Sequence, residues 1–175
     1  MKRKWVWALL AVASAVSVYV GNVLATPPTT PGFSGTTLAR ATFGELDIKA
    51  NTIPDVWKAN LKTKGNSDLY VQQNTWDPSA CGGCTPSTGW HTHPGPSLVI
   101  VTQGTVTEYD GDDPTCTPHV YSANGTNSFV DIGSGAVHII RDESGAVAKT
   151  VVVQLIPKDA TRRIDVTPAP GNCPF

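Results

Sequence analysis

One stretch of this sequence constrains the fold more than any other: residues 89–104, which read GWHTHPGPSLVIVTQG. His91 and His93 are two positions apart, so on an extended strand both side chains leave the same face. The Pro-Gly-Pro that follows ends this strand, because proline cannot donate to a sheet ladder, and the apolar run from Leu98 predicts a buried strand. Two imidazoles on one face can converge on a metal ion, although histidines that only pack and hydrogen-bond fit the same pattern.

A third histidine lies in a matching context. His138 comes after a turn that contains Gly133 and Gly135, and two isoleucines follow it directly. A glycine turn that leads into a β-branched run predicts the start of a strand. All three histidines are therefore expected near strand starts.

These residues resemble the two sequence motifs of the cupin superfamily. The first cupin motif runs His-x-His, then a Glu, then a Gly seven residues after that Glu, and His91, His93 and Gly104 match it. The second runs Pro-x-Gly-x-x-His-x-x-x-Asn, and Gly135 and His138 match it. The resemblance implies a jelly-roll barrel in which these three histidines bind one divalent transition metal ion: iron, zinc, manganese, copper or nickel.

The sequence departs from the cupin motifs at three positions. Ser97 stands where the first motif has its glutamate, Gly133 stands for the proline of the second motif, and Asp142 stands for its asparagine. The resemblance therefore carries over three metal ligands and not four. A site of three neutral imidazoles leaves coordination positions open for water, dioxygen or an anionic substrate. The alternative is a barrel whose histidines only hydrogen-bond around an empty interior.

The chain as a whole reads as short strands separated by glycine and proline turns, which is typical of a sandwich or barrel. With the cupin resemblance, we predict an all-β fold over residues 36–166: a cupin-type jelly-roll (double-stranded β-helix) barrel with at most one short helix. That helix is expected within residues 51–61. There Ile53, Trp57 and Leu61 recur at four-residue spacing after a polar cap and a proline.

The N-terminus has the pattern of a secretory signal. Three basic residues precede an apolar stretch from Trp5 to Val20, and a small-x-small site ends at Ala25. We therefore predict a signal peptide over residues 1–25 and a secreted or periplasmic protein. An uncleaved anchor is the alternative, because the apolar run is near the lower limit of a membrane span. Prolines, threonines and glycines predict a flexible leader over residues 26–35.

The charge of the chain excludes some partners. Removal of residues 1–25 takes away three basic residues and no acidic ones, so the mature chain is net acidic. Without a basic cluster, neither nucleic acid nor an anionic membrane surface is an expected partner, and no later segment could span a membrane. Three aspartates fall within residues 110–113, but the spacing and final glutamate of a hand-type calcium loop are absent, so we expect a solvated turn.

Four cysteines in an exported chain predict disulfides. Three connectivities are possible, and we favour Cys81 with Cys84 and Cys116 with Cys173. The second bond would tie down the Pro-rich C-terminal tail, residues 167–175. A redox-active dithiol is the alternative for the Cys-Gly-Gly-Cys segment, but the βαβ context that would favour it is missing.

Several reactions at such a site need a group that transfers protons. Glu108, Tyr109 and Asp142 are the candidates on or beside the motif strands, although each has a structural explanation too. His119 is expected at the surface, with a fourth ligand or a base as the alternative.

Two functions fit these observations. The first is an exported metal-dependent cupin enzyme, an oxygenase that acts on a small organic molecule. The second is a cupin that binds a metal or a small ligand without turnover, so whether the chain is an enzyme stays open. The resemblance also implies a homodimer as one possible assembly.

Overall fold

The computed structural model describes residues 30–53 and 56–175. The predicted signal peptide, residues 1–25, lies outside these ranges. The first strand, β1 (Phe33–Phe43), begins inside the range that was expected to be a leader, residues 26–35.

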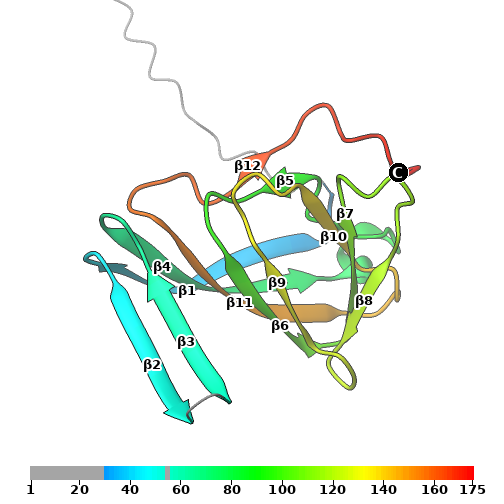
Figure 1. Cartoon of the computed structure of the whole chain (residues 1–175). Coiled ribbons are helices and arrows are strands. Elements are labelled where there is room, and N and C mark those ends of the chain that lie inside the picture. The colour runs from blue at the N-terminus through cyan, green and yellow to red at the C-terminus, as the bar shows by residue number, and fades with distance from the viewer. Residues whose placement is uncertain (1–29, 54–55) are drawn as a thin grey trace, which may run out of the picture.

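Two five-stranded antiparallel sheets face each other and form the body of the molecule (Figure 1). The first sheet contains, in spatial order, β1, β4 (Ser67–Trp76), β11 (Ala148–Pro157), β6 (Ser97–Gln103) and β9 (Ser128–Asp131). The second contains β12 (Ile164–Asp165), β5 (His91–Thr92), β10 (His138–Arg141), β7 (Thr105–Asp110) and β8 (His119–Ser122). The described residues include one short 3-10 helix, η1 (Pro78–Cys81), and none of their helices is long and apolar enough to cross a bilayer.

The strand order identifies the fold. Without the edge strands β1 and β12, one sheet has the order β4-β11-β6-β9 and the other has the order β5-β10-β7-β8. The chain therefore crosses from one sheet to the other at most of its connections. This is the eight-stranded jelly roll with two Greek keys, the architecture that cupins share. The predicted all-β, cupin-type jelly-roll barrel is confirmed.

Alternation along the strands builds an apolar interior. On β6, Val99 and Val101 are buried while Leu98 and Ile100 are about half exposed, because successive residues leave opposite faces of a strand. The interior cluster is completed by Trp76, Val106, Phe129, Ile140, Ala148 and Val152. Several of these side chains also line the cavity described below, so the core supports the site directly.

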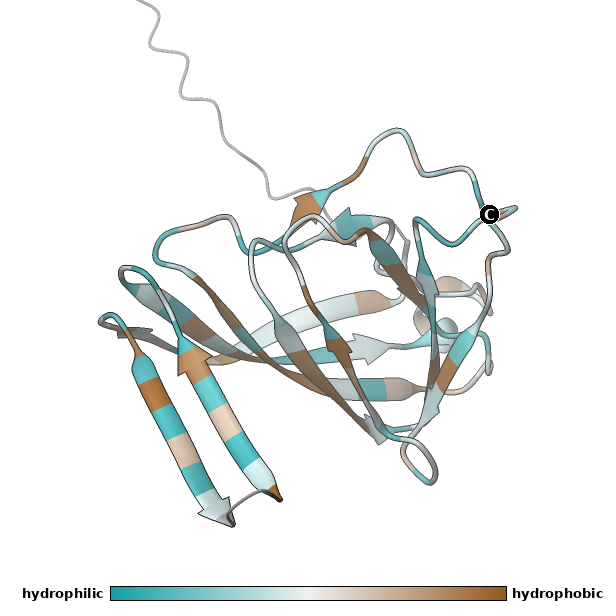
Figure 2. Ribbon diagram, in the orientation of Figure 1, coloured by the Kyte–Doolittle hydropathy of each residue, from teal (hydrophilic) through white to brown (hydrophobic). Residues whose placement is uncertain are grey.

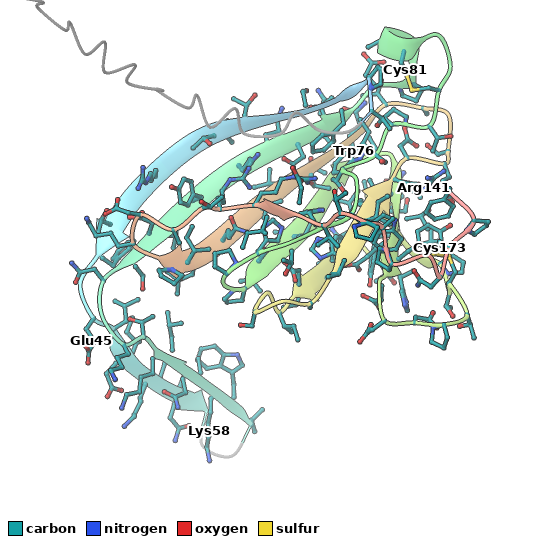
Figure 3. The ribbon with its side chains drawn as sticks, turned by 90° about the horizontal axis from the view of Figure 1, so that it is seen from above. Glu45, Lys58, Trp76, Cys81, Arg141 and Cys173 are labelled. Atoms are coloured by element: carbon teal, nitrogen blue, oxygen red, sulfur yellow. A yellow bond between two sulfur atoms is a disulfide. The ribbon has the colours of Figure 1, made fainter. Side chains whose placement is uncertain are left out.

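The C-terminal tail covers the outer face of the second sheet. Trp90, Tyr109 and Ile139 form a separate buried cluster there with Cys173, which is bonded to Cys116. The Arg141 guanidinium lies 3.7 Å from the centroid of the Phe175 ring, near Cys173 (Figure 3). Cys81 and Cys84 form the other disulfide. Both predicted cysteine pairings are therefore confirmed.

The helix predicted within residues 51–61 is wrong, because this region forms an antiparallel hairpin. Its strands are β2 (Asp47–Ile53) and β3 (Trp57–Lys62), which project from the barrel (Figures 1 and 3). Ile48 pairs with Leu61 and Ala50 with Ala59. Apolar and polar residues alternate along both strands, as Figure 2 shows. A four-residue spacing is also a multiple of two, and Ala59 between Trp57 and Leu61 makes this stripe one face of a strand.

Candidate metal centre

The three predicted histidines converge in the barrel interior. His91 on β5 lies directly opposite His138 on β10, and His93 follows β5 immediately. The centroid of the His91 ring lies 4.4 Å from the centroid of the His138 ring and 4.8 Å from the centroid of the His93 ring. All three side chains are buried, and one nitrogen from each lies within 4.8 Å of the other two. Since imidazole binds transition metals at about 2.0–2.1 Å, two nitrogens that share one ion lie at most about 4.2 Å apart, so the rings would have to move closer together to hold it.

Hydrogen bonds to backbone carbonyls select the tautomer of two of the rings. His91 Nδ1 lies 2.8 Å from the Gly89 carbonyl oxygen, and His93 Nδ1 lies 2.7 Å from that of Arg162. A carbonyl oxygen only accepts, so each Nδ1 carries the proton and donates. The Nε2 atoms of both rings are left with a lone pair, which is the arrangement that metal-binding histidines use.

Burial keeps the cluster uncharged. It lowers the pKa of His91 well below its ordinary value, with a further contribution from His138. Burial also lowers the pKa of His138 to about 4 and, to a smaller extent, that of His93. All three rings are therefore neutral near pH 7, and the neutral ring is the form that binds a metal ion.

A cavity of about 60 Å³ adjoins the three histidines. One water needs at least about 10–15 Å³ of such space, so the cavity holds a few water molecules or a very small organic molecule. Three buried amide oxygens on its wall accept no hydrogen bond from the described part of the chain: Gln72 Oε1, Asn74 Oδ1 and Gln154 Oε1. The cavity therefore offers acceptors to a ligand that carries donor groups.

Sequence reasoning missed Asp131, which lines the same cavity. Its side chain is 3% exposed, and its two carboxylate oxygens each lie 3.7 Å from a histidine nitrogen, Oδ2 from His93 Nε2 and Oδ1 from His138 Nδ1. Its position carried a usable signal. Phe129 and Asp131 share the inward face of β9, and an aspartate in the inward phase of a barrel strand is unusual enough to indicate a site.

Two arginines reach the cavity from the segment before β12. Arg163 donates to Asp165 Oδ1 and to the Thr88 carbonyl oxygen, so its charge is compensated. Arg162 has no ion pair with any carboxylate of the described residues, although it is partly buried. Burial, followed by the charge of Arg163, lowers the pKa of Arg162. An anion in the cavity would supply the missing countercharge.

The predicted proton-transfer candidates lie in different environments. Glu108 is buried and shares the inward face of β7 with the core residue Val106, and burial, followed by the charges of Asp110 and Asp131, raises its pKa to about 7. Tyr109 lies on the outer face and donates to Glu143.

Two further candidates also lie away from the cavity. Asp142 is buried and accepts hydrogen bonds from the Ser144 backbone N–H and hydroxyl, 2.9 and 2.7 Å away, in the turn after β10. His119 is exposed and lies 3.5 Å from Asp110. Among the four candidates, Glu108 is the one on an inward strand face, but none of the four belongs to the cavity lining.

No protein-family model and no curated protein matches this sequence. Similar folds occur among solved structures. A polyketide cyclase from Streptomyces resistomycificus is 16% identical over 58% of this chain and 64% of its own, with a TM-score of 0.43. A cupin superfamily protein from Desulfitobacterium hafniense is 10% identical over 69% and 81%, with a TM-score of 0.40. An oxalate oxidase in complex with the substrate analogue glycolate is 18% identical over 74% and 52%, with a TM-score of 0.42.

The chain thus spans less than two thirds of the length of the cyclase and of the oxidase. The fold follows from the strand order itself. With the jelly-roll order and with His91 and His93 placed across from His138, this chain has the cupin-type fold and the three histidine positions of the cupin motifs.

Proposed function

We propose that this protein is an exported cupin that binds one divalent transition metal ion through His91, His93 and His138. The observation that carries this proposal is the convergence of three buried, neutral imidazoles within 4.8 Å. In two of them a carbonyl oxygen holds the proton on Nδ1 and leaves Nε2 free. A purely structural histidine cluster has no need to keep these lone pairs together in a cavity.

The residues fit iron, zinc, manganese, copper or nickel alike, since neutral imidazole suits all of these ions. When bound, such an ion supplies open coordination positions at which a small molecule can be oxidised or polarised. The protein contributes the rest of the site. Arg162 binds and orients an anionic group, and the apolar wall of Val99 and Phe129 restricts access of water.

These features favour an enzyme, a metal-dependent oxygenase that acts on a small organic anion. The unpaired charge of Arg162 next to three neutral ligands makes the site positive once a metal ion is bound, which selects negatively charged substrates. The small cavity volume, about 60 Å³, restricts the substrate to a few heavy atoms.

The second candidate function is binding of a metal or a small ligand without turnover. The same small volume favours it, because a cavity that holds only a few waters leaves little room for both a substrate and a co-substrate. The two candidates differ in the exchange of bound water and in oxygen consumption.

Export rests on the sequence pattern of residues 1–25 and is supported by the two disulfides. Both pairs of cysteines among the described residues are bonded, and no described cysteine is free. Disulfides of this kind persist in oxidising compartments, as expected of a secreted or periplasmic protein.

Elemental analysis of the mature protein, residues 26–175, tests the proposal. The protein is purified without chelators or a histidine tag, beside a His91→Ala/His93→Ala control. We expect about one equivalent of iron, copper, nickel or manganese that the control lacks, followed by oxygen consumption with small organic acids. Zinc at this level would support the site but redirect the reaction toward hydrolysis or plain binding. A protein that stays free of metal after reconstitution would overturn the proposal.

A further inference from the structure

We propose that Asp131 supplies the carboxylate of this metal site, from β9, in place of the glutamate that the cupin motif has at the position of Ser97 on β6. This inference rests on the proposed metal-binding function. It makes a metal ligand of a residue that lies outside both motifs.

The sheet register makes the replacement possible. Ser97 and Asp131 are direct partners in the antiparallel pair β6 and β9. Side chains at directly opposite positions leave the same face of a sheet, with Cβ atoms about 4.5–5.5 Å apart. A carboxylate at residue 131 therefore enters the part of the barrel that a side chain at residue 97 enters. Both side chains are almost fully buried and line the cavity.

The contacts of Asp131 aim it at the histidines. Its Oδ1 accepts a hydrogen bond from the Gly133 backbone N–H at 2.8 Å, and its Oδ2 accepts one from the Ser97 hydroxyl at 3.3 Å. Each oxygen also lies 3.7 Å from a nitrogen of a different histidine, His93 or His138. Asp131 thus lies between the histidines of the two motifs, and both distances are too long for a hydrogen bond.

Ser97 has become part of the support for this carboxylate. Its hydroxyl donates to Asp131 and accepts from Gln154 Nε2 at 3.0 Å. Gln154 is itself buried on β11. A hydrogen-bonded series from β11 through β6 to β9 therefore fixes the orientation of Asp131, as the outer partners of metal ligands do.

The charge of the Asp131 carboxylate also favours this assignment. No lysine or arginine in the described ranges lies within ion-pair distance of Asp131, and the ring nitrogens 3.7 Å from its two oxygens belong to His93 and His138. A buried carboxylate without a countercharge is costly. A divalent cation among the three histidines would supply the countercharge.

Metal affinity tests this assignment directly. The metal-free wild type, Asp131→Asn and the control Asp112→Asn, an exposed acid outside the cavity, are titrated with Zn²⁺ alone in competition with a chromophoric chelator. We expect Asp131→Asn to weaken binding at least about 10- to 100-fold, since loss of even an outer partner of a metal ligand has this effect, and Asp112→Asn to bind like the wild type. Equal affinity of all three proteins would overturn the inference.

A rescue variant separates a specific role from general damage. In Ser97→Glu/Asp131→Ala the carboxylate returns to the motif position, so we expect tighter Zn²⁺ binding than in Asp131→Ala alone, at matched circular dichroism. If the double variant does not fold, the comparison of Asp131→Asn with Asp112→Asn decides. A wild type that binds no Zn²⁺ would refute the proposed function itself, whereas a wild type and Asp131→Asn that bind equally tightly would refute this inference alone.

Discussion

His138 and His91 lie directly opposite each other on the antiparallel strands β10 and β5, with ring centroids 4.4 Å apart. This pairing joins the two sequence motifs. Since side chains alternate between the faces of a strand, a slip of one residue would turn His138 out of the barrel. The site therefore depends on the register of the second sheet as much as on the identity of its ligands.

Replacement of His138 is expected to remove the metal while the barrel stays folded. His138→Ala leaves two histidines, which hold a divalent ion far less well than three. We expect stoichiometric metal in the wild type and substoichiometric metal in the variant by elemental analysis. His119→Ala is the matched control, because His119 is exposed and outside the cluster. Unchanged metal content in His138→Ala would contradict the site as drawn.

The sequence was sufficient to predict that the three histidines converge, because a strand fixes where residues two apart point. His91 and His93 needed only the period of a strand, and His138 needed the cupin resemblance. The inward phase of Asp131 on β9 could be predicted from the sequence, but its position opposite Ser97 could not, because that depends on the register of β6 and β9. That register is set by barrel closure and not by local sequence.

The wrong helix has a comparable cause. Trp57 and Leu61 fit a helical spacing and a strand spacing equally, and only the partner strand distinguishes the two. Ile48 supplies that partner by pairing with Leu61. The spacing of apolar residues therefore predicts secondary structure least well in short segments, where one spacing fits both a helix and a hairpin strand.

Arg162 is expected to select anionic ligands. Of the two arginines that line the cavity, Arg162 is the one that forms no ion pair with a described residue, and Arg162→Gln removes its charge. A hydrogen bond to a charged group contributes about 1.5–3 kcal/mol. We expect acetate to bind the metal-loaded variant at least about tenfold more weakly, while neutral acetamide binds the variant and the wild type alike. Calorimetry measures both ligands, and metal analysis verifies that the site is intact. Equal acetate binding would count against a role in substrate selection.

Glu108 is expected to make stability fall as pH rises toward neutrality. Its pKa is raised from 4.5 to about 7, mainly by burial, so the folded protein holds this proton where the unfolded chain has lost it. The stabilising contribution is complete below about pH 4.5 and disappears as pH rises through about 7.

Glu108→Gln keeps the size of the side chain but does not titrate. The wild type should therefore lose about 1–3 kcal/mol more than the variant between pH 4.5 and 8. Urea unfolding of the metal-free proteins at several pH values gives this difference, in which the contributions of other groups cancel. Parallel stability curves for the two proteins would show that folding does not raise the pKa of Glu108.

The two disulfides should differ in their contribution to stability. Cys116 and Cys173 are 57 residues apart, whereas Cys81 and Cys84 are separated by 3. The restriction of the unfolded chain grows with loop length, and gives about 4 kcal/mol for the first bond and about 2 kcal/mol for the second. The first bond also holds the tail on the outer cluster of Trp90 and Tyr109. We expect Cys116→Ser/Cys173→Ser to lower the unfolding midpoint more than the control Cys81→Ser/Cys84→Ser. A larger loss in the control would mean that the tail contributes little, and that the second sheet is stable without its cover.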